Sequence, residues 1–228
     1  VFFSGRVADD NDGRLFIKDL DKAGVDFHSA IQDSGITGKC LVFVTKDAER
    51  TMITFLGASE TLSDKDIDRK ALKRSEWFYV EGYLVTDEIR TLLIKKAIDF
   101  AKSNGVKIAV SLSDPLLVSY FGDSLRDIMK VGVDLIFCNQ DEVMVFTKTN
   151  KLDLAVEKLK LISRTFVITC GAHGSLTFDG KSVIRSEGVS AKLIDTNGAG
   201  DMFAGAFLYA ITAGKDYGWA AEFANNCA

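Results

Sequence analysis

The sequence predicts a doubly wound α/β fold, in which a mostly parallel sheet carries helices on both faces. Short apolar segments typical of buried strands alternate with longer segments of helical periodicity from about residue 64 to residue 170. Such alternation indicates βαβ units and therefore a parallel sheet. The length of 228 residues is sufficient for one domain with a buried core.

The chain begins with a predicted strand at residues 1–5 and a predicted helix at 14–23, which Gly24 ends. Two β-rich segments follow at residues 40–45 and 51–55, and the polar residues between them predict a hairpin. No helix accompanies this pair of strands. We therefore expect the hairpin to be an appendage of the main domain.

The later segments supply the units of the main sheet. We predict strands at residues 77–80, 107–112, 134–138 and 165–169, and helices at 64–74, 87–103, 124–130 and 152–162. The helix at 87–103 has Thr86 as its predicted N-cap and Gly105 as its predicted stop. Ligands of open α/β sheets bind beyond the carboxyl ends of the strands. The residues just after Cys138, Thr169 and Ile194 are therefore the first candidates for a site.

The composition is that of an ordinary globular protein, with 47% hydrophobic and 26% charged residues. The net charge of −4 argues against a general nucleic-acid-binding protein. No apolar run approaches the roughly 20 residues that cross a bilayer, so we expect no membrane association. The four cysteines form no CxxC pair, which favours free thiols and a cytoplasmic location. Because the chain starts within a strand pattern and ends within a helical one, we expect both natural termini to lie outside it.

The strongest chemical signal is the string Asp-Thr-Asn-Gly-Ala-Gly-Asp at residues 195–201, which an alanine-rich apolar helix follows. A glycine turn that opens a helix lets a ligand approach the backbone, and the unpaired N–H groups of the first helical turn favour an anion. The site suits a phosphoryl group in transfer. Asp201 follows this turn directly and could accept the proton of an attacking hydroxyl. The alternative is that Asp201 only caps the helix.

This string resembles the C-terminal signature of the PfkB carbohydrate kinase family, whose fold is ribokinase-like. The resemblance covers nearly the whole chain and implies one kinase domain over residues 1–228 that phosphorylates a hydroxyl of a small molecule with ATP. It implies that Asp201 is the general base. It also implies that the backbone of Gly198, Ala199 and Gly200 stabilises the charge of the transferring group.

Two further strings are similar to motifs of the same family. Asn139-Gln-Asp-Glu142 resembles the Asn-x-x-Glu motif, which implies that Asn139 and Glu142 help to place Mg²⁺ and the ATP phosphates. The alternative is a helix start with Asn139 as the cap. Residues 169–174 resemble the Thr-x-Gly-x-x-Gly turn, which implies nucleotide contacts from Thr169, Gly171, Ala172 and Gly174. An ordinary tight turn between two strands is the alternative there.

Weaker similarities extend the same interpretation. Asn225 matches a nucleotide-contacting position in the late helix of the family. Asp195 and Asn197 match positions that hold a monovalent cation such as K⁺ in some relatives. Residues 5–13 resemble an early family motif, with Ala8 in place of the usual glycine.

The hairpin, within a segment of about 37–58, fits the lid of the family, a small β-sheet that closes over the phosphate acceptor and excludes water. Arg50 lies near its turn and could contact the substrate, with a solvated surface arginine as the alternative. The resemblance also implies that a homodimer could form through the lid.

The acceptor stays open between two classes. One is a sugar, such as ribose, fructose or a keto-deoxy sugar acid. The other is a nucleoside such as adenosine, because residues 49–58 resemble bacterial adenosine-kinase-like members. A third hypothesis is a non-catalytic ligand-binding relative, against which the intact Asp201 and glycine turn argue. The early substrate-binding aspartate and the Gly-Gly motif of the family are absent from this chain, and we expect them upstream of Val1.

Overall fold

The computed structural model describes residues 1–27, 35–45, 50–190 and 196–228, and for Arg50 it describes the backbone alone. The chain divides into two compact units, Val1–Ser75 and Glu76–Ala228. Each unit is described by itself below. The larger one carries most of the predicted site residues.

The larger unit is built on a mixed sheet with six described strands in the order β10-β9-β8-β7-β6-β5. The strands are β5 (Trp77–Glu81), β6 (Lys107–Ser111), β7 (Leu135–Asn139), β8 (Thr165–Thr169), β9 (Ser175–Phe178) and β10 (Val183–Ser186). Strands β5 to β8 are parallel, whereas β9 and β10 are antiparallel to their neighbours. The predicted mostly parallel sheet is therefore confirmed, and each parallel strand lies within one residue of its predicted bounds.

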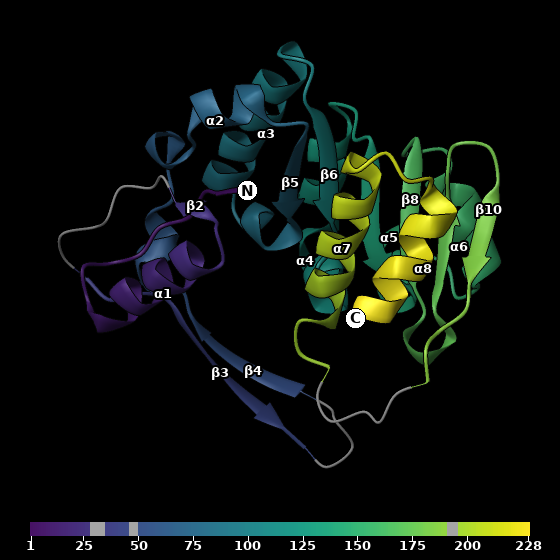
Figure 1. Cartoon of the computed structure of the whole chain (residues 1–228), viewed down its shortest axis with the longest axis horizontal. Helices are drawn as coiled ribbons and strands as arrows, with labels where there is room; N and C mark the ends of the chain where they lie inside the picture. The colour runs from purple at the N-terminus through teal and green to yellow at the C-terminus, as the bar shows by residue number, and fades with distance from the viewer. Residues whose placement is uncertain (28–34, 46–49, 191–195) are drawn as a thin grey trace. The chain divides into compact units, whose positions relative to one another are not determined.

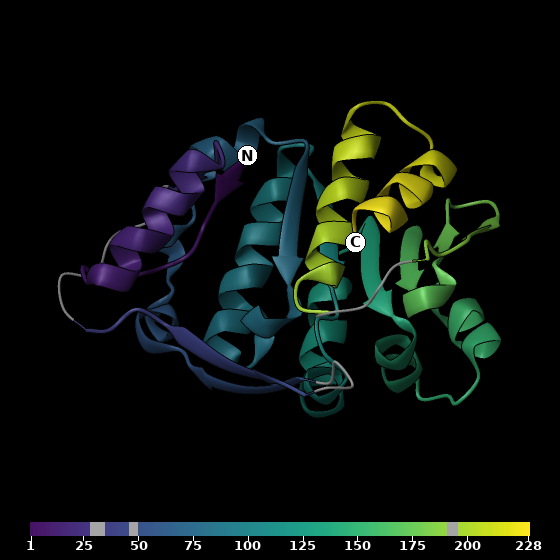
Figure 2. The same cartoon turned by 60° about the horizontal axis from the view of Figure 1, so that its bottom comes forward.

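Helices cover both faces of this sheet (Figures 1 and 2). One face carries α7 (Ala199–Thr212) and α8 (Tyr217–Cys227), and the other carries α3 (Glu88–Ser103), α4 (Pro115–Met129), α5 (Gln140–Thr147) and α6 (Leu152–Leu159). The central strands are buried on both sides, because Ile108, Ala109 and Val110 are successive residues with no exposed surface. Phe203 and Phe207 of α7 pack on the sheet within the same core. The doubly wound arrangement follows from strands that are apolar on both faces.

Helix α4 begins nine residues before the predicted start at residue 124. Asp114 caps it, since its Oδ1 accepts hydrogen bonds from the backbone N–H of Leu116 at 2.8 Å and of Leu117 at 3.1 Å. Pro115 occupies the first helical position, where its missing N–H costs nothing. Pro115 thus starts this helix.

Two other predicted helix starts need correction. The N-cap of α3 is Asp87 rather than Thr86, because the Asp87 carboxylate accepts a hydrogen bond from the backbone N–H of Arg90 at 2.8 Å. The predicted helix at 64–74 is two short pieces, η2 (Asp64–Asp66) and α2 (Arg69–Arg74). Ile67 has extended backbone between them, and Asp68 then caps α2.

The smaller unit contains α1 (Asn11–Lys22) and two small sheets. In one sheet β1 (Phe2–Phe3) runs parallel to β2 (Asp26–Phe27). In the other, β3 (Lys39–Val44) and β4 (Arg50–Phe55) form an antiparallel pair, which confirms the predicted hairpin. The 3₁₀ helix η1 (Gly57–Thr61) follows β4.

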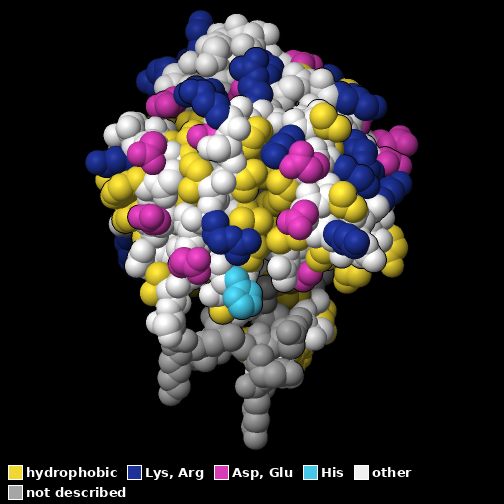
Figure 3. Space-filling model, turned by 90° about the vertical axis from the view of Figure 1, so that its right-hand side faces the viewer, with side chains coloured by type: hydrophobic (Ala, Val, Ile, Leu, Met, Phe, Trp, Pro, Cys, Tyr) yellow, Lys and Arg dark blue, Asp and Glu magenta, His cyan; other side chains and the backbone are white. Residues whose placement is uncertain are grey.

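The side of the larger unit that carries β10, α6 and α8 has a mixed surface (Figure 3). Hydrophobic side chains gather near the middle of this face, and Lys and Arg side chains alternate with Asp and Glu around them. Charges of both signs so close together produce little net field over this face. Within the described part of the chain, no helix has the length and apolar composition needed to cross a bilayer.

Candidate active site

The predicted glycine turn stands at the start of α7. Gly198 is the N-cap residue and has a left-handed backbone with φ 77° and ψ 0°, which favours glycine. No side chain caps this helix end. A Cβ placed on Gly198 or on Gly200 would meet no described atom within 4 Å. The space beside both glycines is therefore open at the first turn of α7, as the approach of an anion to the helix start requires, while the Ala199 backbone N–H donates to the Thr196 carbonyl oxygen at 3.3 Å.

Asp201 is the third residue of α7 and is exposed. The interpretation of Asp201 as the helix cap is wrong, because Gly198 occupies the cap position and no side chain bonds to this helix end. Together with apolar residues of α7 and α8, Asp201 lines a cavity of about 560 Å³. Its carboxylate is therefore accessible to a ligand.

Asn139 and Glu142 form a reciprocal capping box at the start of α5. The Asn139 Oδ1 accepts a hydrogen bond from the Glu142 backbone N–H at 2.8 Å. The Glu142 carboxylate accepts one from the Asn139 backbone N–H at 2.9 Å and one from Asn139 Nδ2 at 2.8 Å. The structure thus contains the helix start that was the alternative to a magnesium site.

Glu142 is nevertheless unusual for a capping residue, because it is buried with 6% of its surface exposed. Burial raises the pKa of its carboxyl to about 7, with smaller contributions from the negative charges of Asp114 and Glu81 and against the opposing hydrogen bond from the Asn139 N–H. Several carboxylates therefore repel one another here. A cation bound nearby would relieve this repulsion.

The arrangement fits a magnesium ion that is shared with phosphates. Among the described residues, no group of three or more His, Cys, Asp or Glu side chains is placed to hold a metal ion on its own. Mg²⁺ is usually bound through one or two carboxylates and substrate phosphates while it keeps several waters. The Glu142 oxygens each retain lone pairs beyond their bonds to Asn139.

Three polar residues at the ends of β5 and β6 were missed in the sequence: Glu81, Ser113 and Asp114. Ser113 Oγ donates a hydrogen bond to Glu81 Oε2 at 2.9 Å and accepts one from the Gly82 backbone N–H at 2.8 Å. Ser113 has a left-handed backbone with φ 68°, which is uncommon for a residue other than glycine. All three residues lie at or just beyond the carboxyl ends of β5 and β6, so the rule that ligands bind beyond the strand ends also points to them.

Electrostatic contacts join Asp201 to this edge of the sheet. Burial raises the pKa of Glu81, and the charge of Asp201 adds to that rise. Burial and the nearby Glu81 raise the pKa of Tyr79, while burial raises that of Tyr83 to about 12, and Asp201 contributes to both shifts. Asp201 in the first turn of α7 is therefore near enough to the polar end of β5 to interact with it electrostatically.

The second glycine turn joins β8 to β9 through η4 (Gly171–His173). Thr169 is the last residue of β8 and Ala172 lies within η4. Gly174 has φ 80°, and a Cβ there would lie 2.0 Å from the Ser186 carbonyl oxygen. A Cβ on Gly188 would likewise lie 2.1 Å from the Ala172 carbonyl oxygen. This turn is therefore packed tightly against residues 186–188.

Asn225 of α8 lies beside this packed turn. Its Nδ2 is within hydrogen-bond distance of Ser175 Oγ at 3.2 Å, of the Glu187 carbonyl at 3.3 Å and of the Ser186 carbonyl at 3.4 Å. The structure thus places Asn225 beside Ser175 and residues 186–187, which adjoin and pack against the predicted nucleotide turn. In this structure the amide of Asn225 ties α8 to the strands.

The structure says less about three other residues of the predicted site. Asp195 lies outside the described residues. Asn197 is exposed in the turn before Gly198. Arg50 starts β4 in the smaller unit, and only its backbone is described.

The comparison with known proteins assigns the whole chain to one protein family. The family model "pfkB family carbohydrate kinase" matches residues 1–228. Adenosine kinase of Saccharomyces cerevisiae is 28% identical over 231 residues, which cover 95% of this chain and 67% of the yeast protein. An uncharacterised sugar kinase of Archaeoglobus fulgidus is 23% identical over 216 residues, which cover 94% of this chain and 84% of the archaeal protein.

The solved structure of adenosine kinase from Sinorhizobium meliloti superposes with a TM-score of 0.95 at 31% identity, covering 99% of this chain and 70% of that one. This chain therefore spans about two thirds of the length of the adenosine kinases that it resembles. The resemblance seen in the sequence and the ribokinase-like fold are both confirmed. The chain belongs to the pfkB family of carbohydrate kinases, a family of ATP-dependent phosphotransferases that includes sugar and adenosine kinases.

Proposed function

We propose that this protein transfers the terminal phosphoryl group of ATP to a hydroxyl group of a small sugar or nucleoside, with Asp201 as the general base. One observation carries the proposal. A carboxylate that does not cap its own helix stands exposed in the first turn of α7, beside a glycine turn with open space around it. That combination provides a base for the acceptor and an anion site for the group in transfer.

In the proposed reaction Asp201 accepts the proton of the acceptor hydroxyl as its oxygen attacks the γ-phosphorus. A new O–P bond forms, the bond from the γ-phosphorus to the bridging oxygen breaks, and ADP leaves with that oxygen. The backbone N–H groups at residues 199 and 200 stabilise the charge on the phosphoryl oxygens during transfer, for which the Ala199 N–H leaves the Thr196 carbonyl oxygen to which it donates at 3.3 Å in this structure. The dipole of α7 acts in the same direction, since its amino end favours negative charge.

We propose that Asn139 and Glu142 help to hold Mg²⁺ through its bound waters, with Asp114 and Glu81 adding negative charge. Mg²⁺ neutralises charge on the phosphates when it is bound. The buried Glu142 and the half-buried Glu81 support this role, because neighbouring negative charges help to raise the pKa of each and a nearby cation would stabilise both carboxylates. We also propose that Asp195 and Asn197 help to bind a monovalent cation such as K⁺. This part of the proposal rests on the family resemblance alone.

For the nucleotide we propose contacts with the turn at Thr169, Gly171, Ala172 and Gly174 and with Asn225. Their close association in the structure supports a shared role. Gly171 and Ala172 are exposed, and a turn of small residues lets a planar or anionic ligand approach the backbone.

Two acceptor classes fit, a small sugar and a nucleoside. The names of the two adenosine kinase relatives, at 28% and 31% identity, favour the nucleoside, and the sugar kinase relative keeps the other class in view. Glu81 and Asp201 offer two hydrogen-bond acceptors for hydroxyl groups of either acceptor.

We propose that both units belong to one kinase domain and that the β3–β4 hairpin serves as its lid, with Arg50 as a substrate contact. The hairpin carries exposed apolar side chains, among them Leu41, Phe43, Ile53 and Phe55. Such residues suit a surface that covers a ligand or meets a second copy of the chain, so we include a homodimer through the lid in the proposal. The four free cysteines suit a cytoplasmic protein.

The test is an acceptor screen. The full-length protein is incubated with ATP and Mg²⁺ and a panel of sugars and nucleosides, and ADP release and acceptor phosphorylation are measured. We expect phosphorylation of one class and none by an Asp201→Asn preparation, which controls for contaminating kinases. Absence of acceptor-dependent ADP release over the whole panel would contradict the proposed function.

A further inference from the structure

Among the residues that the structure describes, the β3–β4 hairpin has no third strand in its sheet, and it is exposed over most of its described length. An isolated pair of strands is only marginally stable in water. Its direction must therefore be fixed where it leaves the rest of the smaller unit. Both of its ends are held there, and each by a separate set of contacts.

Thr37, just before β3, is held by Asp10. The Asp10 carboxylate accepts a hydrogen bond from Thr37 Oγ1 at 2.6 Å and one from the Thr37 backbone N–H at 2.9 Å. The same carboxylate caps α1 by accepting from the Gly13 backbone N–H at 2.8 Å. Thr37 Oγ1 in turn accepts from the Ala8 backbone N–H at 3.0 Å. The β3 end is therefore joined to the start of α1.

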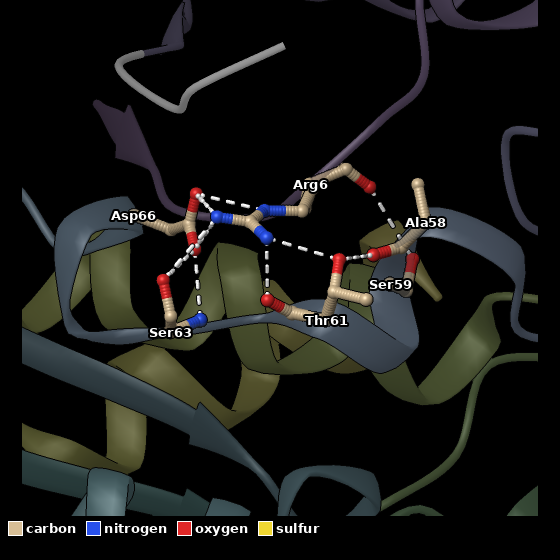
Figure 4. Close-up of polar contacts among 6 residues, drawn as sticks. All are labelled: Arg6, Ala58, Ser59, Thr61, Ser63 and Asp66. Carbon is tan, nitrogen blue, oxygen red and sulfur yellow. Dashed lines mark hydrogen bonds and ion pairs between the residues drawn. The ribbon is translucent and has the colours of Figure 1, made fainter. Parts of the chain in front are cut away.

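The segment after β4 is held by Arg6 (Figure 4). The Arg6 guanidinium donates to the carbonyl oxygen of Thr61 at 2.6 Å and to its Oγ1 at 2.9 Å. It also donates to Ser63 Oγ at 3.2 Å and forms an ion pair with Asp66 at 2.8 Å. The Asp66 side chain is fully buried and accepts two further hydrogen bonds from Ser63. This is a charged network whose members lie up to 60 positions apart in the sequence.

The two ends approach each other closely between these contacts. The Ala58 backbone N–H donates to the Ile36 carbonyl oxygen at 2.9 Å. A Cβ on Gly57 would lie 2.3 Å from the Ile36 carbonyl oxygen, and one on Gly38 would lie 2.6 Å from that of Leu56. A Cβ on Gly13 would lie 2.1 Å from the Ala8 carbonyl oxygen. The root of the hairpin is therefore packed backbone against backbone.

We propose that Arg6 and Asp10 are positioning residues that fix the root of the lid, so that the hairpin keeps one direction relative to α1. The inference rests on the proposed function in one respect, the role of the hairpin as the lid. With a loosened root, the hairpin would sample more directions, the acceptor would bind less tightly, and water would compete with it for the phosphoryl group. Neither residue needs to touch a substrate for this effect.

Arg6→Lys tests the β4 side. Lysine keeps the charge but cannot reproduce the fork that reaches Thr61, Ser63 and Asp66 together. Arg69→Lys is the matched control, because Arg69 pairs with Asp64 in the same unit at the surface. Thr37→Val tests the β3 side, because it removes the hydroxyl group that bonds to Asp10 with little change in side-chain volume. If the Arg6 variant does not fold, Thr37→Val alone is used as the test.

Two measurements on the full-length protein are compared. Hydrogen exchange of the β3 and β4 amides needs no activity, and we expect it to accelerate in Arg6→Lys and Thr37→Val but not in Arg69→Lys. In kinetics we expect the KM for the acceptor to rise about tenfold while kcat stays within about twofold, a pattern that a general loss of stability would not produce. ADP release without acceptor should increase as well.

Unchanged exchange in the hairpin, or an unchanged acceptor KM in an active variant, would overturn the inference. A fall of kcat together with a lower unfolding temperature and no change in KM would also overturn it, because it would show a purely structural role. A wild-type protein without kinase activity would instead contradict the proposed function, whatever the exchange data show. The two failures are therefore distinguishable.

Discussion

The turn after β8 and the turn before α7 are both rich in glycine, but an added methyl group would meet different surroundings in each. At Gly174 it would lie 2.0 Å from a backbone oxygen. Residues 186–188 occupy that space, so the turn needs glycine in order to fold. Here the glycine makes room for another part of the same chain.

At Gly200 a methyl group would meet no described atom within 4 Å, and the backbone there is ordinary helix. Folding of the described residues does not require glycine at that position. A helix without such a constraint is slightly more stable with alanine. We infer that Gly200 leaves room for a ligand, and the contrast with Gly174 separates a glycine needed for packing from one needed for function.

Gly200→Ala tests the contrast with the largest expected effect. We expect kcat/KM to fall about 10²-fold, because the methyl group would occupy space beside the N–H donors that stabilise the phosphoryl group. The unfolding temperature should stay unchanged or rise slightly. Gly218→Ala is the control, since Gly218 is the second residue of α8 as Gly200 is of α7; its Cβ would lie 3.3 Å from Asp216 Oδ1, which is tight, and otherwise meet only Ile184 at 3.8 Å or more, so a small loss of stability but no loss of activity is expected there. An active Gly200→Ala enzyme would break the comparison.

Gly174→Ala should have the opposite pattern. The left-handed backbone and the clash with the Ser186 carbonyl should together cost about 2–4 kcal/mol of stability. Urea unfolding of the purified variant measures this change. A stability equal to that of the wild type would show that the turn can relax, and the packing role of Gly174 would then be wrong.

Glu142→Gln sharpens the comparison by removing a buried charge near the open turn. The folded protein keeps Glu142 protonated up to about pH 7, whereas the unfolded chain ionises it near its ordinary value of 4.5. The folded state therefore binds more protons between these values, and wild-type stability should fall as pH rises through them, by about 3 kcal/mol at most.

Glu142→Gln should lack the loss of stability that ionisation of Glu142 causes in the wild type. The stability of the variant relative to wild type should therefore improve from about pH 5 to about pH 8. Unfolding measured across this range without Mg²⁺ provides the check. Parallel pH profiles for the two proteins would show that Glu142 is not the group responsible.

Asn225→Ala should have the smallest effect. Its three contacts are long, at 3.2–3.4 Å, so we expect a loss of about 1–2 kcal/mol in stability. If the amide also contacts the nucleotide, the KM for ATP should rise severalfold while kcat changes little. A KM for ATP equal to that of the wild type would show that Asn225 only holds α8 against the strands and does not contact the nucleotide.

The parallel strands could be predicted because each is a short apolar run, buried on both faces, between polar or glycine-containing turns. Strand β10 was missed, since it has only four residues and includes the polar Arg185. The start of α4 was also missed. Phe121 has non-helical φ and ψ in the middle of that helix, so its periodicity is interrupted there.

The site could be predicted where one contiguous string carries it, as with the glycine turn and Asp201. The exposed position of Asp201 could not, because it depends on Gly198 taking the cap. Glu81 and Asp114 could have been proposed from their place at the ends of β5 and β6, but their approach to Glu142 depends on the pairing of separate strands in the sheet. The sequence also could not separate a capping box from a magnesium site at Asn139 and Glu142, since the same atoms serve both.

The most direct measurement is the turnover of full-length Asp201→Asn at saturating ATP and acceptor. If Asp201 accepts the proton of the attacking hydroxyl, kcat should fall by about 10²–10⁴-fold while both KM values and the unfolding temperature stay close to those of the wild type. Turnover at the wild-type rate would contradict the account.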